Sequence, residues 1–351
     1  MPVADPDPPG LELGAVAAWL SARGLVDGPL TAELVAGGRS NLTYLLSSGS
    51  SDSSEQGRLV LRRPPLGHVL ATAHDMAREH RVLSALQGTG VPVPRPLALC
   101  SDETVTGAPF YVMTFADGLI VRTRADAEAI PADGRSAMVL AMMSVLADLH
   151  AVDPAAVGLG DFGRPEGFLA RQVRRWGAQL DASRSRELPG VDELRSRLAA
   201  TVPVSPPEAA IVHGDYRLDN LVVGPPSAKD AYRVRAVLVW EMATLGDPLA
   251  DLGLLVAYWE GLGRLPGSAV AALGPAAGMP AGSVLVAEYA GRSGRDLSAL
   301  PWCVAFGYFK IAVILEGIHY RFVQGRTVGP GFDRIGEAVP ALVALGLAAL
   351  P

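Results

Sequence analysis

The pattern of apolar residues changes near residue 117, and this change limits the folds open to the chain. Before that point, short apolar runs alternate with turns rich in glycine, serine or proline, as in a small β-sheet. After it, long stretches carry apolar residues at helical spacing, and only the runs 210–212 and 234–240 have the composition of strands. We therefore expect an α+β protein with a strand-rich part at 1–116 and a larger, mainly helical part at 117–351.

The expected elements follow from these runs. Two runs joined by a polar segment, 42–46 and 59–63, predict a hairpin, and 109–115 predicts a further strand. The stretches with helical spacing are 11–23, 74–86, 137–150, 166–180, 249–260 and 302–323.

Charge and composition exclude several classes of protein. The net charge is −6 with no block of basic residues, which argues against a nucleic-acid partner. The N-terminus has no basic and apolar signal segment, and two cysteines far apart fit a reducing compartment. The most apolar helix contains Lys310 and Glu316, so we expect it to pack inside the protein rather than cross a membrane. A cytoplasmic protein with no membrane partner is expected.

The strongest local signal is the segment His213-Gly214-Asp215-Tyr216-Arg217-Leu218-Asp219-Asn220, which directly follows an apolar run. An aspartate followed five residues later by an asparagine has the spacing of a phosphotransfer loop. There, a carboxylate accepts the proton of an attacking hydroxyl, and an amide oxygen holds a metal ion on the nucleotide phosphates. The competing interpretation is a polar turn in which Asp215 and Asn220 bond their own backbone.

This segment resembles the HGDxxxxN loop of the aminoglycoside phosphotransferase family, small-molecule relatives of the protein kinases. Similar downstream residues are Trp240-Glu241, Gly246-Asp247-Pro248 and Asp251-Leu252, and the likeness runs from about Leu30 to Arg326. It is greatest to the branch that includes kinase-like domains fused to some acyl-CoA dehydrogenases. The resemblance implies a bilobal protein-kinase-like fold with ATP and Mg²⁺ between the lobes. It also implies that Asp215 is the catalytic base, that Asn220 is a metal ligand, and that Asp247 and Asp251 brace the loop.

Kinases hold the nucleotide phosphates with a cation on a strand, paired with a helical glutamate. The chain has only the lysines Lys229 and Lys310, so this cation must be an arginine. Arg62 and Arg63 end a predicted strand; because side chains alternate, only one can face the nucleotide, and the family register favours Arg62. Its expected partner is Glu79, on the apolar face of a helix, although Glu79 could instead pair with a local arginine.

The resemblance also implies where the rest of the nucleotide lies. The glycine-rich turn between two predicted strands would cover the phosphates; its residues are Gly37, Gly38, Arg39, Ser40 and Asn41. The backbone of Met113, Thr114 and Phe115 would hydrogen-bond the adenine. The glycine pattern by itself is equally typical of an ordinary turn.

One position departs from the family. Its second metal-binding aspartate precedes the Trp-Glu pair, where this chain has Val239, and valine cannot ligate Mg²⁺. If 239–241 stays extended, Glu241 faces the same side and could replace the aspartate as a tentative metal ligand. Asp219 or Asp247 could instead act through water, and Glu241 could be a structural carboxylate paired with a basic side chain.

These residues predict an ATP-dependent phosphotransferase that acts on a hydroxyl of a small molecule. The alternative is an impaired pseudokinase that binds nucleotide or ligand, supported by Val239, whether natural or introduced by design. A protein kinase is disfavoured because the loop has His-Gly-Asp and the chain lacks an Ala-Pro-Glu segment. Expected liners of the acceptor site are Tyr258, Trp259, Glu260, Glu316, His319 and Tyr320. They favour a more apolar acceptor, such as an acyl thioester, over a cationic aminoglycoside, but composition does not decide between these.

Overall fold

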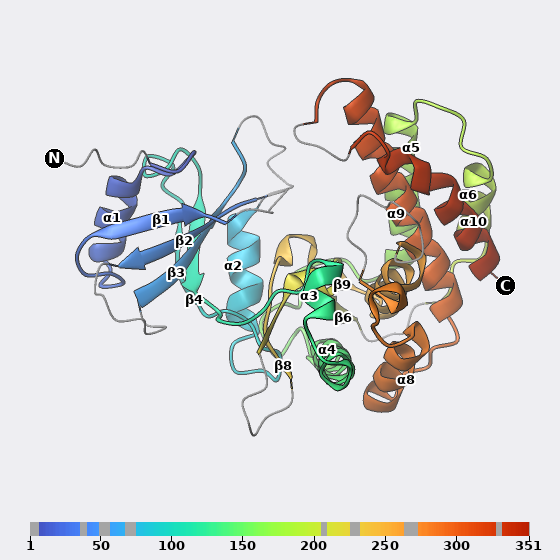
Figure 1. The fold of residues 1–351 in the computed structure, drawn as a ribbon, viewed down its shortest axis with the longest axis horizontal. Coiled ribbons are helices and arrows are strands. Elements are labelled where there is room, and N and C mark those ends of the chain that lie inside the picture. The colour runs from blue at the N-terminus through green and yellow to red at the C-terminus, as the bar shows by residue number, and fades with distance from the viewer. Residues whose placement is uncertain are drawn as a thin grey trace. The chain divides into compact units, whose positions relative to one another are not determined.

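The computed structural model describes residues 7–35, 41–48, 57–66, 75–204, 209–224, 232–262, 273–327 and 332–350. The chain divides into two compact units (Figure 1). Unit 1 comprises 1–117 together with 236–241, and unit 2 comprises 118–235 and 242–351. Unit 1 therefore includes a short piece of chain from far beyond the strand-rich N-terminal part.

Unit 1 is built on an antiparallel sheet with the strand order β1-β2-β3-β5-β4. Its strands are β1 (Leu30–Leu34), β2 (Leu42–Ser48), β3 (Arg58–Arg63), β4 (Pro96–Cys100) and β5 (Phe110–Thr114). The expected hairpin is the β2–β3 pair, in which Tyr44 lies opposite Leu61. β3 is central, with β2 on one side and β5 on the other, so the side chains of β3 are fixed from both edges.

Alternation along β3 sends its side chains to opposite faces of the sheet. Leu59 and Leu61 join the apolar core beneath α1 (Leu13–Ser21), which contributes Val16 and Leu20. Arg62 instead pairs with Glu79 of α2 (Met76–Ala85), so it belongs to the other face. The α2 helix begins after Asp75, whose carboxylate accepts a hydrogen bond from the Arg78 N–H at 2.9 Å, a typical N-cap.

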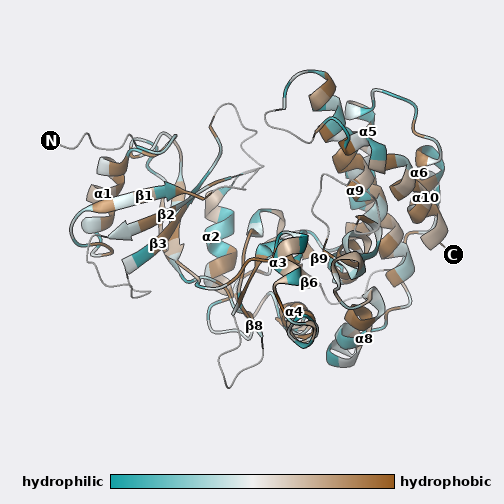
Figure 2. Cartoon of the chain, in the orientation of Figure 1, coloured by the Kyte–Doolittle hydropathy of each residue, from teal (hydrophilic) through white to brown (hydrophobic). Residues whose placement is uncertain are grey.

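Unit 2 is mainly helical. Its helices are α3 (Arg124–Glu128), α4 (Ala132–Ala151), α5 (Phe168–Ser183), α6 (Val191–Ala200), α7 (Leu249–Val256), α8 (Gly282–Ser293), α9 (Leu300–Val323) and α10 (Val339–Ala349). The long helix α9 packs against α5, α6, α7 and α10. Figure 2 shows how much of α9 is apolar. Of the described residues, only α9 is long and apolar enough to cross a membrane, but 72% of its 18-residue window is buried inside the protein.

Two short strand pairs flank the loop motif, of which β6–β9 is antiparallel. β6 (Ala210–Val212) pairs with β9 (Thr244–Gly246), while β7 (Leu221–Gly224) pairs with β8 (Arg233–Val237). The expected strand at 234–240 was too long, because β8 ends at Val237. Val239 then has φ 65°, a left-handed conformation that a β-branched side chain strongly disfavours, and a 3₁₀ turn follows at Trp240–Met242.

Candidate active site

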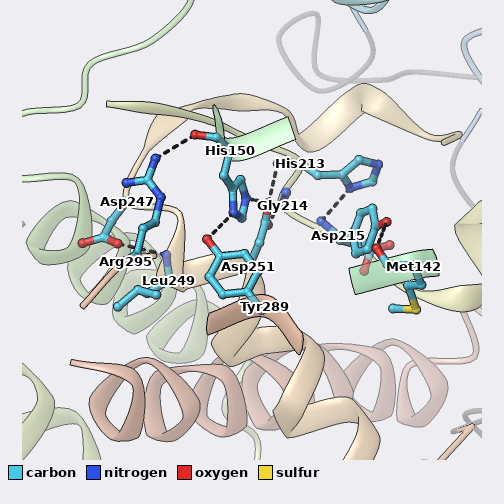
Figure 3. Close-up of polar contacts among 11 residues, drawn as sticks. Met142, His150, His213, Gly214, Asp215, Asp247, Leu249, Asp251, Tyr289 and Arg295 are labelled. Carbon is cyan, nitrogen blue, oxygen red and sulfur yellow. Dashed lines mark hydrogen bonds and ion pairs between the residues drawn. The ribbon is translucent and has the colours of Figure 1, made fainter. Parts of the chain in front are cut away.

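The loop motif begins where β6 ends, and a buried carboxylate holds its first residues. The N–H groups of His213 and Gly214 donate to the two oxygens of Asp251, at 2.7 and 2.8 Å (Figure 3). Asp251 is 1% exposed and lies in the first turn of α7, whose N–H groups favour a carboxylate there. The brace implied by the resemblance is therefore present at Asp251, whereas Asp247 accepts a hydrogen bond from Leu249 N–H at 3.0 Å within its own segment.

His150 and Tyr289 complete the support of Asp251 (Figure 3). His150 lies with Nε2 3.3 Å from Asp251 Oδ2 and Nδ1 2.8 Å from the Tyr289 hydroxyl. Burial works to raise the pKa of Asp251, but His150 and the N–H groups of the loop outweigh it and hold that pKa below its ordinary value. Both His150 and His213 are held by hydrogen bonds to neighbouring residues.

Gly214 is required by the shape of this turn. Its φ of +84° lies in the region that favours glycine, and a Cβ there would lie 2.8 Å from both Cβ and the carbonyl oxygen of Met242. The next residue, Asp215, donates its N–H to His213 Nδ1 at 3.2 Å. The main chain that carries the Asp215 carboxylate is therefore tightly constrained.

The structure brings together the two principal residues of the motif. Asn220 ends the 3₁₀ turn Leu218–Asn220, and its Nδ2 donates to the Asp215 carbonyl oxygen at 2.8 Å and to Asp215 Oδ2 at 2.9 Å. With Nδ2 used in this way, the amide oxygen of Asn220 is the atom left to bind a cation. The Asp215 side chain is 30% exposed, so an incoming group can reach it.

Arg217 ties together the acidic residues of the loop. Its Nε lies 3.3 Å from Asp215 Oδ1, its Nη2 lies 2.6 Å from Asp219 Oδ2, and its guanidinium stacks 4.5 Å from the ring centre of Tyr258. Burial raises the pKa of Asp219, and Arg217 opposes that rise. Arg217, Asp219, Tyr258 and Trp259 also line one small cavity.

Two of the residues expected to line the acceptor site are already engaged. Glu316 is fully buried, and Arg186 donates to both of its carboxylate oxygens, at 2.8 to 3.2 Å. Glu260 accepts a hydrogen bond from the Gly282 N–H at 2.5 Å. Glu316 is therefore a structural carboxylate that no acceptor can reach, so the expectation was wrong for Glu316, whereas the role of Glu260 stays a prediction.

Unit 1 carries a separate charged cluster around Arg62. Its Nε lies 3.0 Å from Glu79 Oε2, and its Nη2 lies 3.0 Å from Glu241 Oε2. Tyr111 donates its hydroxyl proton to Glu79 Oε2 at 3.0 Å. Burial raises the pKa of Glu79 although Arg62 pulls it down, because the side chain is only 1% exposed. The Arg62–Glu79 pair follows the pattern that the resemblance implies.

Asn41 is the one residue of the glycine-rich turn within the described part of the chain. Its Nδ2 donates to Glu79 Oε1 at 2.8 Å and to Glu241 Oε2 at 3.0 Å. The other predicted residues of this turn, Gly37, Gly38, Arg39 and Ser40, lie outside the described residues. The side chain of Asn41 is thus part of the charged cluster around Arg62.

Arg63 is directed away from this cluster. It donates to the carbonyl oxygens of Gly10, Thr106 and Pro64, on the opposite face of the sheet from Glu79. The arginine that the family register disfavours is therefore a structural residue, which follows from strand alternation.

The predicted adenine-binding segment, 113–115, lies partly in β5 and partly beyond its end. Met113 lies in the ladder opposite Val60, and the Thr114 N–H donates to the Arg95 carbonyl oxygen at 2.9 Å. Phe115 lies just beyond the strand and carries the Arg58 guanidinium 4.1 Å from its ring centre. The backbone of Phe115 is therefore outside the sheet ladder, whereas Met113 and Thr114 are within it.

The residues present fit a magnesium site only in part. Asn220 supplies an amide oxygen, but Val239 supplies none, and no group of three or more histidine, cysteine or acidic residues gathers for a metal within the described part. The extended segment that would align Glu241 with position 239 is absent, because the backbone turns at Val239 and Trp240–Met242. Instead, Glu241 Oε2 is paired with Arg62, as the structural alternative expected.

Sequence reasoning missed the roles of Tyr111, Arg217 and Lys310. Tyr111 is part of the apolar run that forms β5, and such a run predicts burial but not a contact of the hydroxyl group. Lys310 is in an apolar helix far along the chain from the loop that it contacts. Lys310 donates to the Gly214 carbonyl oxygen at 2.9 Å. A signal was available for Lys310, because a charge in the apolar part of a helix needs a partner when it is buried.

Comparison with known proteins shows the family to which the chain belongs. The model of the phosphotransferase enzyme family matches residues 31–284. Acyl-CoA dehydrogenase family member 11 from Gallus gallus is 35% identical over 325 residues, which cover 91% of this chain and 40% of that protein. The Homo sapiens protein of the same name is 33% identical over 313 residues, covering 88% of this chain and 39% of that protein. The chain thus spans about two fifths of the length of these relatives.

Solved structures share the fold over the whole chain. A provisionally assigned aminoglycoside phosphotransferase from Ralstonia eutropha JMP134 is 33% identical, with a TM-score of 0.80, over 97% of this chain and 98% of that chain. Aminoglycoside 2″-phosphotransferase IIIa in complex with GDP and kanamycin is 12% identical with a TM-score of 0.63, over 96% of this chain and 99% of that chain, and shows the kinase-like α+β fold alone. From the family match and the relatives above 30% identity, the chain is a member of the phosphotransferase enzyme family.

Proposed function

We propose that the chain transfers the γ-phosphate of ATP to a hydroxyl group of a small molecule. The observation that carries this proposal is the geometry of Asp215 and Asn220. One amide nitrogen holds both the backbone and the carboxylate of Asp215, so the carboxylate is oriented but still 30% exposed. A fixed and accessible carboxylate is what a base needs to accept the proton of an attacking hydroxyl.

In the proposed reaction, the hydroxyl proton passes to Asp215 while the hydroxyl oxygen bonds to the γ-phosphorus. The bond from that phosphorus to the bridging oxygen breaks, and ADP leaves with the electron pair. Arg217 lies with Nε 3.3 Å from Asp215 Oδ1 and so helps to hold this carboxylate in place.

Unit 1 would bind the nucleotide. Arg62 is a permanently charged cation that can take two phosphate oxygens, and Glu79 holds it in place. The backbone of Phe115, outside the sheet ladder, is the best candidate to bond the adenine. The residues of the glycine-rich turn that lie outside the described part of the chain remain candidates to cover the phosphates.

A bound Mg²⁺ ion would neutralise phosphate charge as the transfer proceeds. The amide oxygen of Asn220 is its proposed ligand, and Glu241 is a tentative second ligand only if its carboxylate leaves Arg62. The protein residues described above otherwise act on the hydroxyl and the nucleotide directly.

The first experiment measures transfer from γ-labelled ATP to a panel of hydroxyl compounds that includes apolar alcohols, hydroxyacyl thioesters and aminoglycosides. We expect Asp215→Asn to lower the transfer rate by a factor of about 100 or more without changing ATP affinity, because the base acts on the hydroxyl and not on the nucleotide. Asp219→Asn is the matched control in the same loop. Transfer at an unchanged rate by Asp215→Asn would contradict the proposed role.

The second candidate function is a pseudokinase that binds nucleotide without turnover. Val239 favours it, because this residue cannot ligate a metal where the resemblance implies an aspartate. Calorimetric titration with ATP separates the two functions: affinity that rises with Mg²⁺ supports the enzyme, and affinity indifferent to Mg²⁺ supports the pseudokinase. In that second case, Val239→Asp tests whether one carboxylate restores the metal dependence.

A further inference from the structure

A buried lysine from a distant helix contacts the loop that carries Asp215. Lys310 is in α9 and is 9% exposed. Its Nζ donates to the Gly214 carbonyl oxygen at 2.9 Å and lies 5.3 Å from the ring centre of Trp176 in α5. The ammonium is therefore placed between an aromatic face and the backbone of the loop, a geometry in which both contacts favour a cation.

The choice of lysine at this position is informative. The chain has 30 basic residues, and only Lys229 and Lys310 among them are lysines. An arginine carries a broad planar group, whereas an ammonium is a compact point charge. At a position only 9% exposed, the compact ammonium needs less space than a guanidinium would.

The contact fixes the peptide group that leads into Asp215. The N–H of Gly214 is held by Asp251 at 2.8 Å, and its carbonyl oxygen is held by Lys310 at 2.9 Å. Both peptide groups that flank Gly214 are thus anchored, one by α7 and one by α9. The Gly214 carbonyl group and the Asp215 nitrogen belong to the same planar peptide group. The orientation of this peptide group therefore sets the direction of the chain at Asp215.

Keeping a charge in this place is costly for the fold. Burial lowers the pKa of Lys310, and the nearby carboxylates of Asp215 and Asp251 oppose that change. An apolar side chain of similar volume would often stabilise a buried position at least as well as a charge does. The ammonium is therefore better explained by what it does to the loop than by stability.

We propose that Lys310 is a positioning residue for the phosphotransfer: its ammonium fixes the Gly214–Asp215 peptide group and so aims the Asp215 carboxylate at the acceptor. This inference rests on the proposed function for its catalytic part. The anchoring of the loop by α9 does not depend on that function, because hydrogen exchange at Asp215 tests it without turnover.

The experiment compares the wild-type chain with Lys310→Met, which keeps the length of the side chain and removes the charge. The probe is ATP with Mg²⁺ and the panel of hydroxyl compounds described above, and the readouts are ADP release, ATP affinity and hydrogen exchange of the Asp215 amide. We expect kcat to fall by a factor of about 10 or more, ATP affinity to stay within about twofold, and exchange at Asp215 to rise about tenfold. The thermal midpoint should not fall, which separates positioning from loss of fold.

Two further variants complete the experiment. Leu315→Ala, a buried change in the same helix about 140° around its axis from Lys310, controls for general loosening of α9 and should leave exchange at Asp215 unchanged. Lys310→Arg should not restore the rate, because a broad planar guanidinium replaces a compact ammonium at a position only 9% exposed. If Lys310→Met does not fold, Lys310→Gln, which keeps a donor without the charge, gives the same readouts.

The outcomes are distinct. An unchanged exchange rate at Asp215 in the folded Lys310 variant overturns the inference, as does an unchanged kcat in an active enzyme. If the wild-type chain releases no phosphate from ATP and transfers none to any acceptor, the proposed function fails. In that case, faster exchange at Asp215 still establishes the anchor from α9, and unchanged exchange removes it.

Discussion

Arg62 bridges two carboxylates that lie 162 positions apart in the chain, with Nε 3.0 Å from Glu79 Oε2 and Nη2 3.0 Å from Glu241 Oε2. Both glutamates are held by one permanent charge, which cannot be removed at any pH that the fold survives. Any anionic ligand that binds Arg62 therefore meets a cation that is already shared, and it must displace one of the carboxylates or approach the remaining N–H groups.

Replacing Arg62 is the direct test of this cluster. Arg62→Met leaves Glu79 and Glu241 without their cation, so we expect a loss of about 3 kcal/mol or more in the free energy of unfolding, together with weaker ATP binding. Denaturant titration and calorimetry measure the two effects. Arg63→Met is the matched control: it also removes a buried guanidinium, but its folded form should keep the ATP affinity of the wild type. Equal losses of affinity in both variants would contradict the assignment of Arg62.

The turn at Gly214 should not tolerate a side chain. In Gly214→Ala the methyl group meets Met242 at 2.8 Å and the φ of +84° is strained, so we expect a loss of more than about 2 kcal/mol and a large fall in turnover. Gly88→Ala has a similar φ of +79° but no atom within 4 Å of the added Cβ. It should lose only about 1 kcal/mol and keep full turnover, as measured by urea unfolding and phosphate release.

Val239 stores backbone strain that a smaller residue would release. A β-branched residue with φ 65° costs about 1–3 kcal/mol, so Val239→Gly should leave stability unchanged or raise it, despite the entropy that glycine adds to the unfolded chain. Val237→Gly, at a fully buried strand position nearby, should instead lose about 2 kcal/mol or more. Thermal unfolding of both variants measures the difference, and equal destabilisation would show that position 239 is not strained.

The support from Asp251 should depend on pH in a defined direction. Its folded pKa lies below the ordinary value near 3.8, so its contribution to stability is complete above that value and is lost as the pH falls through the lower folded pKa. Asp251→Asn should therefore cost about 3 kcal/mol near neutral pH, and the difference from wild type should shrink in acid. The exposed Asp148→Asn, paired with Arg292 at 3.7 Å, should change stability by less than about 1 kcal/mol at either pH. A gap that stays constant with pH would contradict a charged role for Asp251.

The sequence predicted best what lies close together along the chain or follows a simple period. Asp215 and Asn220 are five positions apart in one loop, and alternation along β3 separated Arg62 from Arg63. The structure shows that Asp215 contacts Asn220 and that Arg62 and Arg63 have different partners, while the parts of these residues in a reaction stay predictions. The hydrogen bonds from Asn41 to Glu241 and from Lys310 to Gly214 were not predictable, because each joins segments about 100 or more positions apart through the tertiary fold alone.

The error at 239–241 has a physical cause. A run of apolar residues favours a strand, but the spacing of apolar residues does not show where the backbone enters the left-handed region of positive φ. Val239 adopts the left-handed region against its own preference, which only the surrounding structure can impose. The expected alignment of Glu241 with position 239 failed for this reason.

The segment 236–241 gives the chain an unusual order of assembly. Unit 1 needs these residues, yet they follow 118 residues of unit 2, so during synthesis the N-terminal unit stays incomplete until residue 241 has emerged from the ribosome. Until then, Arg62 and Glu79 lack Glu241, and the first 117 residues must persist as an unfinished intermediate. Completion of the first unit is thus tied to synthesis of the first part of the second, and a fragment cut at residue 117 is expected to be a substrate for chaperones rather than an independent domain.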